Sequence, residues 1–481
     1  MKQTITLLLV LMPLIIFSQE CDCISKLKWV KKTFEENDAG FVHTLEKKTE
    51  LAYQIHNQKF EEKVSTIKDP IVCLQNLYQW LKFFRLGHIG IRLTDEAKKT
   101  EVKIDSDKIR AQYKDWEKLE VDTNDFTTYL KSKKNCDFEG IWLSEPYEIG
   151  VKKVGEEYLG FIIEADGSFW TEGQVKFKIH ADKTATYYMR DHAARNFDHA
   201  ELLGKNYLQM GHISLKRVLP EFVDDAPDTK RYFKIIEAQK PFIETIDNNT
   251  ILLRIPSFRI AQKIYIDSLI STHKAQILST PNLIIDLRNN GGGSDQSYYE
   301  LLPLIYTDTI RGVGVEFFST PLNNQKLLRL AEDTENDFTD SDREMFKREY
   351  EKLSKHIGEF VNLDSVIVDK TSFDTIYPYP QKVGIIINGN CASTTEQFLL
   401  AAKQSKKVKL FGTKTFGALD VSNMNFTLSP CGDFELGYCR SKSYRIPDMA
   451  IDDVGIQPDY YLNQEIPKYE WIKHVTEILN H

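Results

Sequence analysis

The sequence predicts a mixed α/β protein in which a helical N-terminal segment and a small all-β module precede an α/β core. Three patterns carry this prediction. Apolar residues recur at three- and four-residue spacing over 24–134, short alternating runs between turn residues fill 136–219, and apolar strands alternate with helical patterns from residue 232 onward. The 481 residues are enough for two or three domains, and the 42% of hydrophobic residues provide material for their cores.

The N-terminal residues have the pattern of a secretory signal. Lys2 precedes an apolar run over 5–17, and Ser18 then supplies a small residue suited to cleavage. A run of about 13 residues is too short for a comfortable membrane span, and no later stretch approaches the required length. We therefore expect a signal peptide and a mature chain with no integral membrane segment, exported to the periplasm or the extracellular space.

Shifts in pattern predict the boundaries of the remaining parts. Within the helical segment, alternation over 87–93 predicts one strand that follows a turn. The charged stretch 221–230 is the predicted linker before the core. The expected parts are a signal peptide over 1–18, an N-terminal helical domain over 19–135, a small all-β barrel or sandwich over 136–220, the core over 228–465 and a C-terminal helix over 466–481.

The cysteines and the charge restrict the compartment and the partners. Seven cysteines fit an oxidising compartment. Cys431 and Cys439 flank a short glycine-containing segment that predicts a hairpin, so we expect them to pair. The connectivity of a second bridge among the earlier cysteines stays open. The net charge is −8 and no stripe of Lys and Arg stands out, so we expect no nucleic-acid partner.

Two segments run from a buried strand through a glycine turn towards a helix. The first, Leu283–Gly293, ends in three glycines but lacks the Gly-Lys-Ser/Thr of a phosphate loop, which leaves an oxyanion hole or a tight connection as alternatives. The second runs through Asn388 and Gly389 to Ser393-Thr394-Thr395-Glu396. This tetrapeptide is a capping box, so the serine is open to interpretation as a cap or as a nucleophile at a helix start.

Taken together, the segments resemble the tail-specific and tricorn-type serine peptidases. Asp286–Gly293 and Asn390–Glu396 match two motifs of that family, and Gly412–Gly417 and Asp452–Asp459 look like its G-x-x-T-x-G loop and its closing segment. The resemblance covers roughly Tyr232 to Leu462. It implies a mixed-sheet peptidase core of the crotonase-like or ClpP-like spiral type. The implied activity is cleavage of peptide or protein substrates through an acyl-enzyme, without a cofactor or a metal.

By this resemblance, Ser393 is the nucleophile. The backbone N–H of Thr394 and one N–H from Gly292 or Gly293 would form the oxyanion hole, where donors must face the developing negative charge. Many members activate the serine with a lysine just after the T-x-G motif, but that position is Ala418 here. Lys414 is close in sequence and lies on the other side of the glycine.

Tricorn-type members instead use a histidine from an N-terminal segment, together with a late acidic residue. His88, in Leu86-Gly87-His88-Ile89-Gly90, resembles that histidine segment, and Asp452 falls at the acidic position, where Glu is usual. We predict that His88 is the general base and that Asp452 orients its tautomer. Asp420 is a second carboxylate candidate, and Glu396 is alternatively a capping residue.

Several other interpretations remain open. Cys391 is an alternative nucleophile two residues before Ser393. We expect His192, His199 and His212 at surface or turn positions, without metal-ligand spacing. The chain is alternatively a non-catalytic binding protein on the same fold, for an apolar ligand or a peptide. An esterase is less favoured, because the G-x-S-x-G pentapeptide is absent around Ser393.

Overall fold

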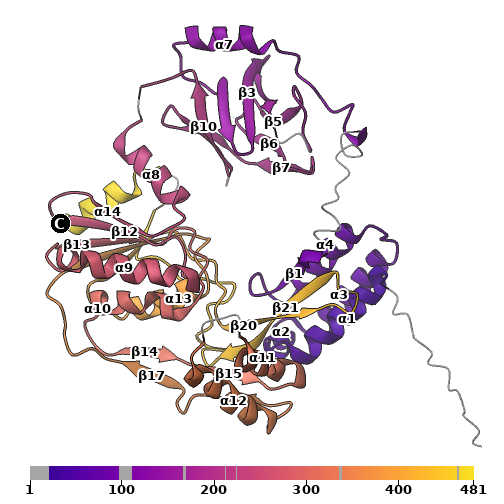
Figure 1. The fold of residues 1–481 in the computed structure, drawn as a ribbon, viewed down its shortest axis with the longest axis vertical. Coiled ribbons are helices and arrows are strands. Elements are labelled where there is room, and N and C mark those ends of the chain that lie inside the picture. The colour runs from indigo at the N-terminus through magenta and orange to yellow at the C-terminus, as the bar shows by residue number, and fades with distance from the viewer. Residues whose placement is uncertain are drawn as a thin grey trace, which may run out of the picture.

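The computed structural model of the protein describes residues 21–96, 111–165, 169–211, 213–223, 225–334, 338–462 and 465–481. The predicted signal peptide and His212 lie outside these residues. Within the described ranges, no helix combines the length and the apolar character needed to cross a membrane. The chain forms several sheets flanked by helices, so the predicted mixed α/β class is confirmed (Figure 1).

The core contains a six-stranded sheet whose order is β11-β12-β13-β18-β19-β22. All neighbours from β12 to β22 pair in parallel, and β11 pairs antiparallel at the edge. The strands are β11 (Phe242–Thr245), β12 (Thr250–Arg254), β13 (Asn282–Asp286), β18 (Lys382–Ile387), β19 (Val408–Gly412) and β22 (Tyr460–Tyr461). The segments that follow β12, β13, β18 and β19 therefore meet at the carboxyl edge of the sheet, where ligands of open α/β sheets bind.

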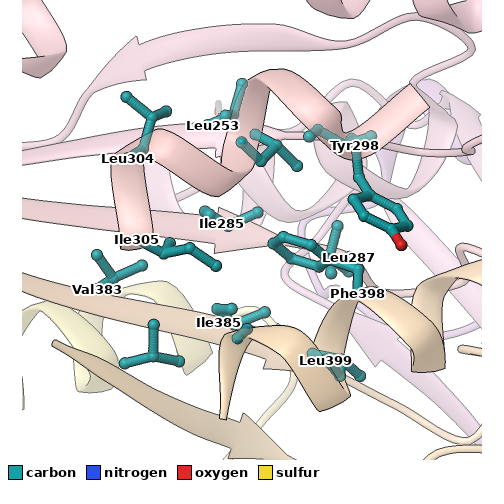
Figure 2. Packing of buried hydrophobic residues seen from close by; sticks show 14 of the residues in the cluster. Leu253, Ile285, Leu287, Tyr298, Leu304, Ile305, Val383, Ile385, Phe398 and Leu399 are labelled. Atoms are coloured by element: carbon teal, nitrogen blue, oxygen red, sulfur yellow. The ribbon is translucent and has the colours of Figure 1, made fainter. Parts of the chain in front are cut away.

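Helices cover both faces of this sheet because its strands are apolar on both sides. On one face, Ile285 and Ile385 pack against Phe398 and residues of neighbouring helices (Figure 2). On the other face, Ile284 and Ile386 pack against the C-terminal helix. The helical elements are α8 (Pro227–Glu237), α9 (Ile260–Ile277), η1 (Asp295–Leu301), α10 (Leu302–Ile305), α13 (Thr394–Ala402) and α14 (Trp471–Asn480).

A five-stranded sheet joins the N-terminal segment to the core. Strand β1 of the N-terminal segment pairs antiparallel with β21, which also pairs with β15 and with β20. Its strands are β1 (Gly90–Leu93), β15 (Val315–Phe318), β16 (Phe360–Val361), β20 (Val421–Leu428) and β21 (Phe434–Ser443). Leu436 and Tyr438 of β21 pack into the same apolar cluster as the N-terminal helices. The strand predicted after residue 87 is therefore an edge strand of a core sheet.

Two further sets of helices and strands accompany this five-stranded sheet. The N-terminal helices are α1 (Cys23–Asn37), α2 (Phe41–Lys48), α3 (Glu50–Val64) and α4 (Pro70–Leu81). The charged stretch between β15 and β18 forms α11 (Pro321–Glu332) and α12 (Asp340–Ser354), while β14 (Ile310–Val313) pairs with β17 (Val368–Thr371).

The all-β module is one antiparallel nine-stranded sheet with the order β7-β6-β5-β4-β3-β2-β10-β9-β8. It forms the top of Figure 1, beneath the helix α7 (Thr123–Ser132). Trp116 and Phe126 from the predicted helical segment pack against this module. Residues 113–130 therefore belong by their contacts to the module. Its strands are β2 (Gly140–Ser144), β3 (Tyr147–Val154), β4 (Glu157–Glu164), β5 (Val175–Ile179), β6 (Ala185–Tyr188), β7 (Ala194–Phe197), β8 (Ala200–Leu203), β9 (Tyr207–Met210) and β10 (Ile213–Leu219).

His192 lies in the turn between β6 and β7, one of the two predicted kinds of position, but it is buried there and not at the surface. Its ring is stacked between Tyr113 and Trp170, with ring centroids 3.8 and 3.9 Å away, and the residue is only 5% exposed. The burial lowers the pKa of His192 to about 4, so the ring is neutral at physiological pH. The histidine is therefore an aromatic component of the module's core, a role that its polar neighbours in the sequence conceal.

The predicted Cys431–Cys439 disulfide is wrong. Cys431 bonds to Cys21, and Cys23 bonds to Cys73, while Cys439 is a buried free thiol. The segment around Cys431 is a hairpin turn as predicted, but Cys439 lies within β21 opposite Met424, several residues from the turn. Both disulfides thus involve the start of the N-terminal segment, and one of them ties that segment to the β20–β21 turn.

Candidate active site

Ser393 lies at the carboxyl edge of the core sheet, between the turn after β18 and the first residue of α13. Its backbone has φ 59° and ψ −125°, a conformation that side-chain-bearing residues rarely adopt. Its N–H is placed between two acceptors, the carbonyl of Ala418 at 3.0 Å and Glu396 Oε2 at 3.1 Å. These contacts hold the strained backbone, which is a feature often found at functional sites.

The side chain of His88 meets the serine hydroxyl. His88 Nε2 lies 3.1 Å from Ser393 Oγ, and His88 Nδ1 lies 2.7 Å from the carbonyl oxygen of Val421. A carbonyl only accepts hydrogen bonds, so the contact assigns the proton to Nδ1 and leaves the lone pair of Nε2 facing the hydroxyl. Burial lowers the pKa of His88, which favours the neutral ring that a general base requires.

Asp452, predicted to orient the tautomer of His88, has no direct hydrogen bond with it in the described part of the chain. Its carboxylate instead accepts hydrogen bonds from the N–H groups of Leu419, Asp420 and Val421, at 2.6, 2.7 and 3.0 Å. Burial, and then the nearby Asp420, raise the pKa of Asp452. The carboxylate thus fixes the peptide segment whose Val421 carbonyl holds the histidine. Sequence reasoning located the carboxylate but not the backbone carbonyl between the two side chains, because any residue type can supply a carbonyl.

Asp420, the second carboxylate candidate, is turned away from the histidine. It is fully buried and paired with Arg445, with 2.7 Å between Asp420 Oδ1 and Arg445 Nε. Its other oxygen accepts the N–H groups of Ile451 and Asp452 at 2.5 and 2.9 Å. Asp420 and Asp452 therefore bind each other's backbone and lock two chain segments together beside the site.

The position where a lysine is expected is closed to a long side chain. Ala418 is buried, and a Cβ on Gly87 would lie only 2.5 Å from the Ala418 Cβ. The methyl group therefore lies directly against the residue that precedes His88. Lys414, the other lysine considered, is exposed. The small side chain at 418 leaves the space through which the histidine segment reaches the serine.

The glycine loop after β13 lies against Ser393. A Cβ on Gly292, whose φ is 95°, would stand 2.8 Å from the Ser393 Cβ and 2.9 Å from the Thr394 nitrogen. The Gly292 N–H is occupied, since it donates to Asn290 Oδ1 at 3.0 Å. The N–H groups of Gly293 and Thr394 have no hydrogen-bond acceptor among the described residues. Of the two glycines named from the sequence, Gly293 is thus the one with an available donor.

Buried polar side chains that the sequence did not single out shape this loop. Asn290 Oδ1 also accepts the N–H of Phe258 at 3.2 Å, and the Asn290 carbonyl accepts the Thr395 hydroxyl at 2.8 Å. Asp286 is fully buried between Arg288 and Arg254. These residues join the glycine loop to the start of α13, so the two motif segments form one unit.

Glu396 does more than cap the helix. The carboxylate is fully buried and accepts four hydrogen bonds: two through Oε1, from the Thr415 hydroxyl at 2.5 Å and the Gly417 N–H at 2.8 Å, and two through Oε2, from Ala418 and Ser393 N–H. Burial raises its pKa, while the four donors oppose that change. Glu396 therefore connects α13 to the 415–418 loop directly behind the serine.

Cys391 has the contacts of a structural thiol. It is fully buried, its Sγ lies 3.1 Å from the Leu287 carbonyl, and burial raises its pKa to about 12. A thiol with this pKa supplies almost no thiolate near neutral pH, which disfavours the alternative of a cysteine nucleophile. Within the described residues, no cluster of three or more His, Cys, Asp or Glu is arranged to hold a metal ion.

One family model matches the core of the chain. Residues 249–462 match the family model of peptidase family S41, a range that includes Ser393 and Asp452 but not His88. No curated protein matches the chain.

Several solved structures are similar in fold at low sequence identity. Mature CPAF has 14% identity and a TM-score of 0.49, with 95% of each chain covered. A putative peptidase from Parabacteroides merdae ATCC 43184 has 10% identity and a TM-score of 0.45, covering 96% of this chain and 98% of that one. The photosystem II D1 C-terminal processing protease has 11% identity and a TM-score of 0.39, covering 96% and 98%. The core of the chain is thus similar to peptidase family S41 over residues 249–462.

Proposed function

We propose that the protein is an exported serine peptidase in which Ser393 is the nucleophile and His88 its general base. The observation that carries the proposal is the His88 ring itself, bound through Nδ1 to a carbonyl and through Nε2 to the serine hydroxyl. A serine hydroxyl is a weak nucleophile unless a base accepts its proton. The buried neutral imidazole provides that base at 3.1 Å.

The geometry supports an acyl-transfer sequence. Ser393 Oγ attacks the scissile carbonyl carbon while its proton moves to His88 Nε2. The oxyanion is stabilised by two N–H groups: that of Gly293, in the loop after β13, and that of Thr394, at the start of α13. The imidazolium then protonates the leaving amine, and the C–N bond breaks to leave an ester on Ser393. Water, deprotonated by His88, hydrolyses that ester and restores the free serine.

In this mechanism Asp452 acts on the histidine through the backbone. It fixes the amides of 419–421, and the Val421 carbonyl then holds Nδ1–H through the catalytic cycle. The carboxylate also favours the imidazolium at a distance, since its charge raises the pKa of His88 against the effect of burial. The arrangement is comparable to a Ser-His-Asp triad, except that the Val421 peptide lies between the histidine and the carboxylate.

Export is part of the proposal because the chain contains two disulfide bonds. Two disulfides tie the N-terminal segment, one of them to a hairpin 410 residues away in sequence. Such bonds persist in oxidising compartments and are rare in the cytosol. The apolar N-terminal run read from the sequence agrees with that location.

The test is covalent labelling with a fluorescent fluorophosphonate, followed by hydrolysis of fluorescein-labelled casein. We expect the intact protein to be labelled and Ser393→Ala to be unlabelled. His88→Ala should lower kcat by about 10⁴-fold or more, because the hydroxyl loses its base. Lys414→Ala serves as the matched control and should keep full activity. A folded intact protein that is neither labelled nor active would reject the proposal and favour a non-catalytic binding protein.

A further inference from the structure

His88 stands in a backbone conformation that needs support. Its φ is 54°, in the left-handed region that is costly for a residue with a side chain. The ring contacts described above hold its side chain, but they do not fix its peptide. The carbonyl oxygen of His88 receives two donors: Arg85 Nη2 at 3.0 Å and the Cys439 thiol at 3.3 Å. Arg85 is the stronger donor because its guanidinium is charged.

Arg85 is itself held by a buried carboxylate at the end of α1. Arg85 Nη1 and Nη2 reach the two oxygens of Asp38 at 2.8 and 2.5 Å, and both residues are at most 5% exposed. A bidentate pair of this kind fixes the plane of the guanidinium. Nη2 also donates to the His88 carbonyl, so the orientation of the guanidinium determines where the His88 peptide lies.

Asp38 also ties the pair to the core sheet. Its two oxygens accept the N–H groups of Gly40 at 2.9 Å and of Cys439, in β21, at 3.0 Å. The Cys439 carbonyl accepts the Ala39 N–H at 2.9 Å. The end of α1, the His88 turn and β21 are thus joined by a buried polar network.

We propose that Asp38 and Arg85 are positioning residues for the reaction, which hold the His88 peptide so that Nε2 faces the Ser393 hydroxyl. This inference rests on the proposed function, since it assigns the means by which the base reaches the serine. Through this arginine, a carboxylate at the end of α1 is connected to the histidine.

The charges around His88 make the effect of Arg85 measurable. The charged and titratable groups around the histidine are Arg85 on its own segment, Asp38 from α1, Cys439 from β21 and Asp452. Burial lowers the pKa of His88 most, and the Arg85 charge lowers it further, while the Val421 carbonyl and Asp452 raise it. Removing the arginine charge should therefore move the acidic limb of activity to higher pH, whereas a purely structural role would leave the limb in place.

The experiment measures the rate of fluorophosphonate labelling at Ser393 against pH, on the full secreted chain with its disulfides formed. Arg85→Gln should lower the labelling rate by about tenfold or more and shift its acidic limb upward, because a misplaced base loses efficiency steeply with distance. Arg85→Lys keeps the positive charge but loses the bidentate geometry of the guanidinium. Its labelling rate should therefore fall, while the acidic limb stays at the same pH. Arg92→Gln removes an arginine whose exposed side chain pairs with Glu435, and it should match the intact protein.

The outcomes separate this inference from the proposed function. An intact protein that is not labelled at Ser393 rejects both. The positioning role alone is overturned by a second result, in which the intact protein is labelled at Ser393. In that result, Arg85→Gln is labelled at a rate within about twofold of the intact protein, and the acidic limb of its pH dependence does not move. If the Arg85 variants lack the native circular dichroism spectrum, Asp38→Asn replaces them, since it keeps the shape of the pair. A native Asp38→Asn variant that reacts at the full rate overturns the inference as well.

Discussion

Ser393 and His88, the proposed nucleophile and base, both occupy left-handed backbone positions, with φ 59° and 54°, but their two turns are supported in different ways. The serine turn is held by Glu396, three residues along the chain, and by a loop that the same carboxylate binds. The histidine depends on groups far away in sequence: Asp38 holds the arginine that binds its carbonyl, and the Val421 carbonyl, 333 residues distant, binds its ring. One half of the site is therefore built locally, and the other half exists only after the N-terminal segment docks on the core.

The local half should be the less tolerant of changes in shape. Gly292→Ala would place a methyl group 2.8 Å from the Ser393 Cβ at a φ of 95°, so we expect kcat/KM to fall by about 100-fold. Gly291→Ala is the matched control, because no atom lies within 4 Å of its added Cβ. Steady-state hydrolysis of labelled casein would measure both. Equal losses in the two variants would contradict the close packing between loop and nucleophile.

Glu396 supports the serine turn and Asp452 supports the histidine. Replacing each carboxylate by its amide should leave a different number of hydrogen-bond donors unpaired. Each oxygen of Glu396 accepts two hydrogen bonds, so Glu396→Gln strands two buried donors in either orientation and should lower the free energy of unfolding by about 3 kcal/mol. Asp452→Asn keeps the two donors of Oδ1 and loses only the Val421 N–H. We expect it to lower kcat by about tenfold, through a misplaced Val421 carbonyl.

Urea unfolding of both variants, alongside their kcat values, would measure this difference. The comparison fails if Asp452→Asn unfolds as easily as Glu396→Gln while keeping its full kcat.

The smallest expected effect is a shift in pH dependence. Because burial lowers the pKa of His88, its base form persists below the usual histidine range near 6.5. The rate of Ser393 labelling should thus rise with pH along an acidic limb whose midpoint lies below 6.5, and stay level through neutral pH. Asp452→Asn removes a charge that raises this pKa, so the limb should move to still lower pH. A midpoint above 6.5 in the intact protein would contradict the burial of the ring.

The parts of the site that sequence patterns predicted are those encoded by neighbouring residues. Ser393 and the triple-glycine turn follow buried strands and precede helices, and a parallel sheet brings such turns to one edge. The strand at 90–93 was also readable from its alternation. The absence of a lysine at 418 directed attention to His88, although only the structure shows that the Ala418 methyl lies against Gly87.

The parts that were missed depend on contacts between distant residues. The Cys431–Cys439 pairing followed from closeness in sequence, yet Cys431 meets Cys21 because α1 docks beside the β20–β21 turn. The burial of His192 likewise needs Tyr113 and Trp170 from separate segments. Asp452 is linked to the histidine through the backbone of Val421, and such a link leaves no trace in side-chain types.

The sequence by itself determined the α/β class, the strand–turn–helix units and the residue types that chemistry at Ser393 requires, since periodicity and glycine positions act over a few residues. The tertiary structure decided which side chain meets the serine hydroxyl and how that side chain is held. Those contacts join α1, the His88 turn, β21 and the segment after Ala418. Their geometry depends on packing across hundreds of residues, which no local pattern records.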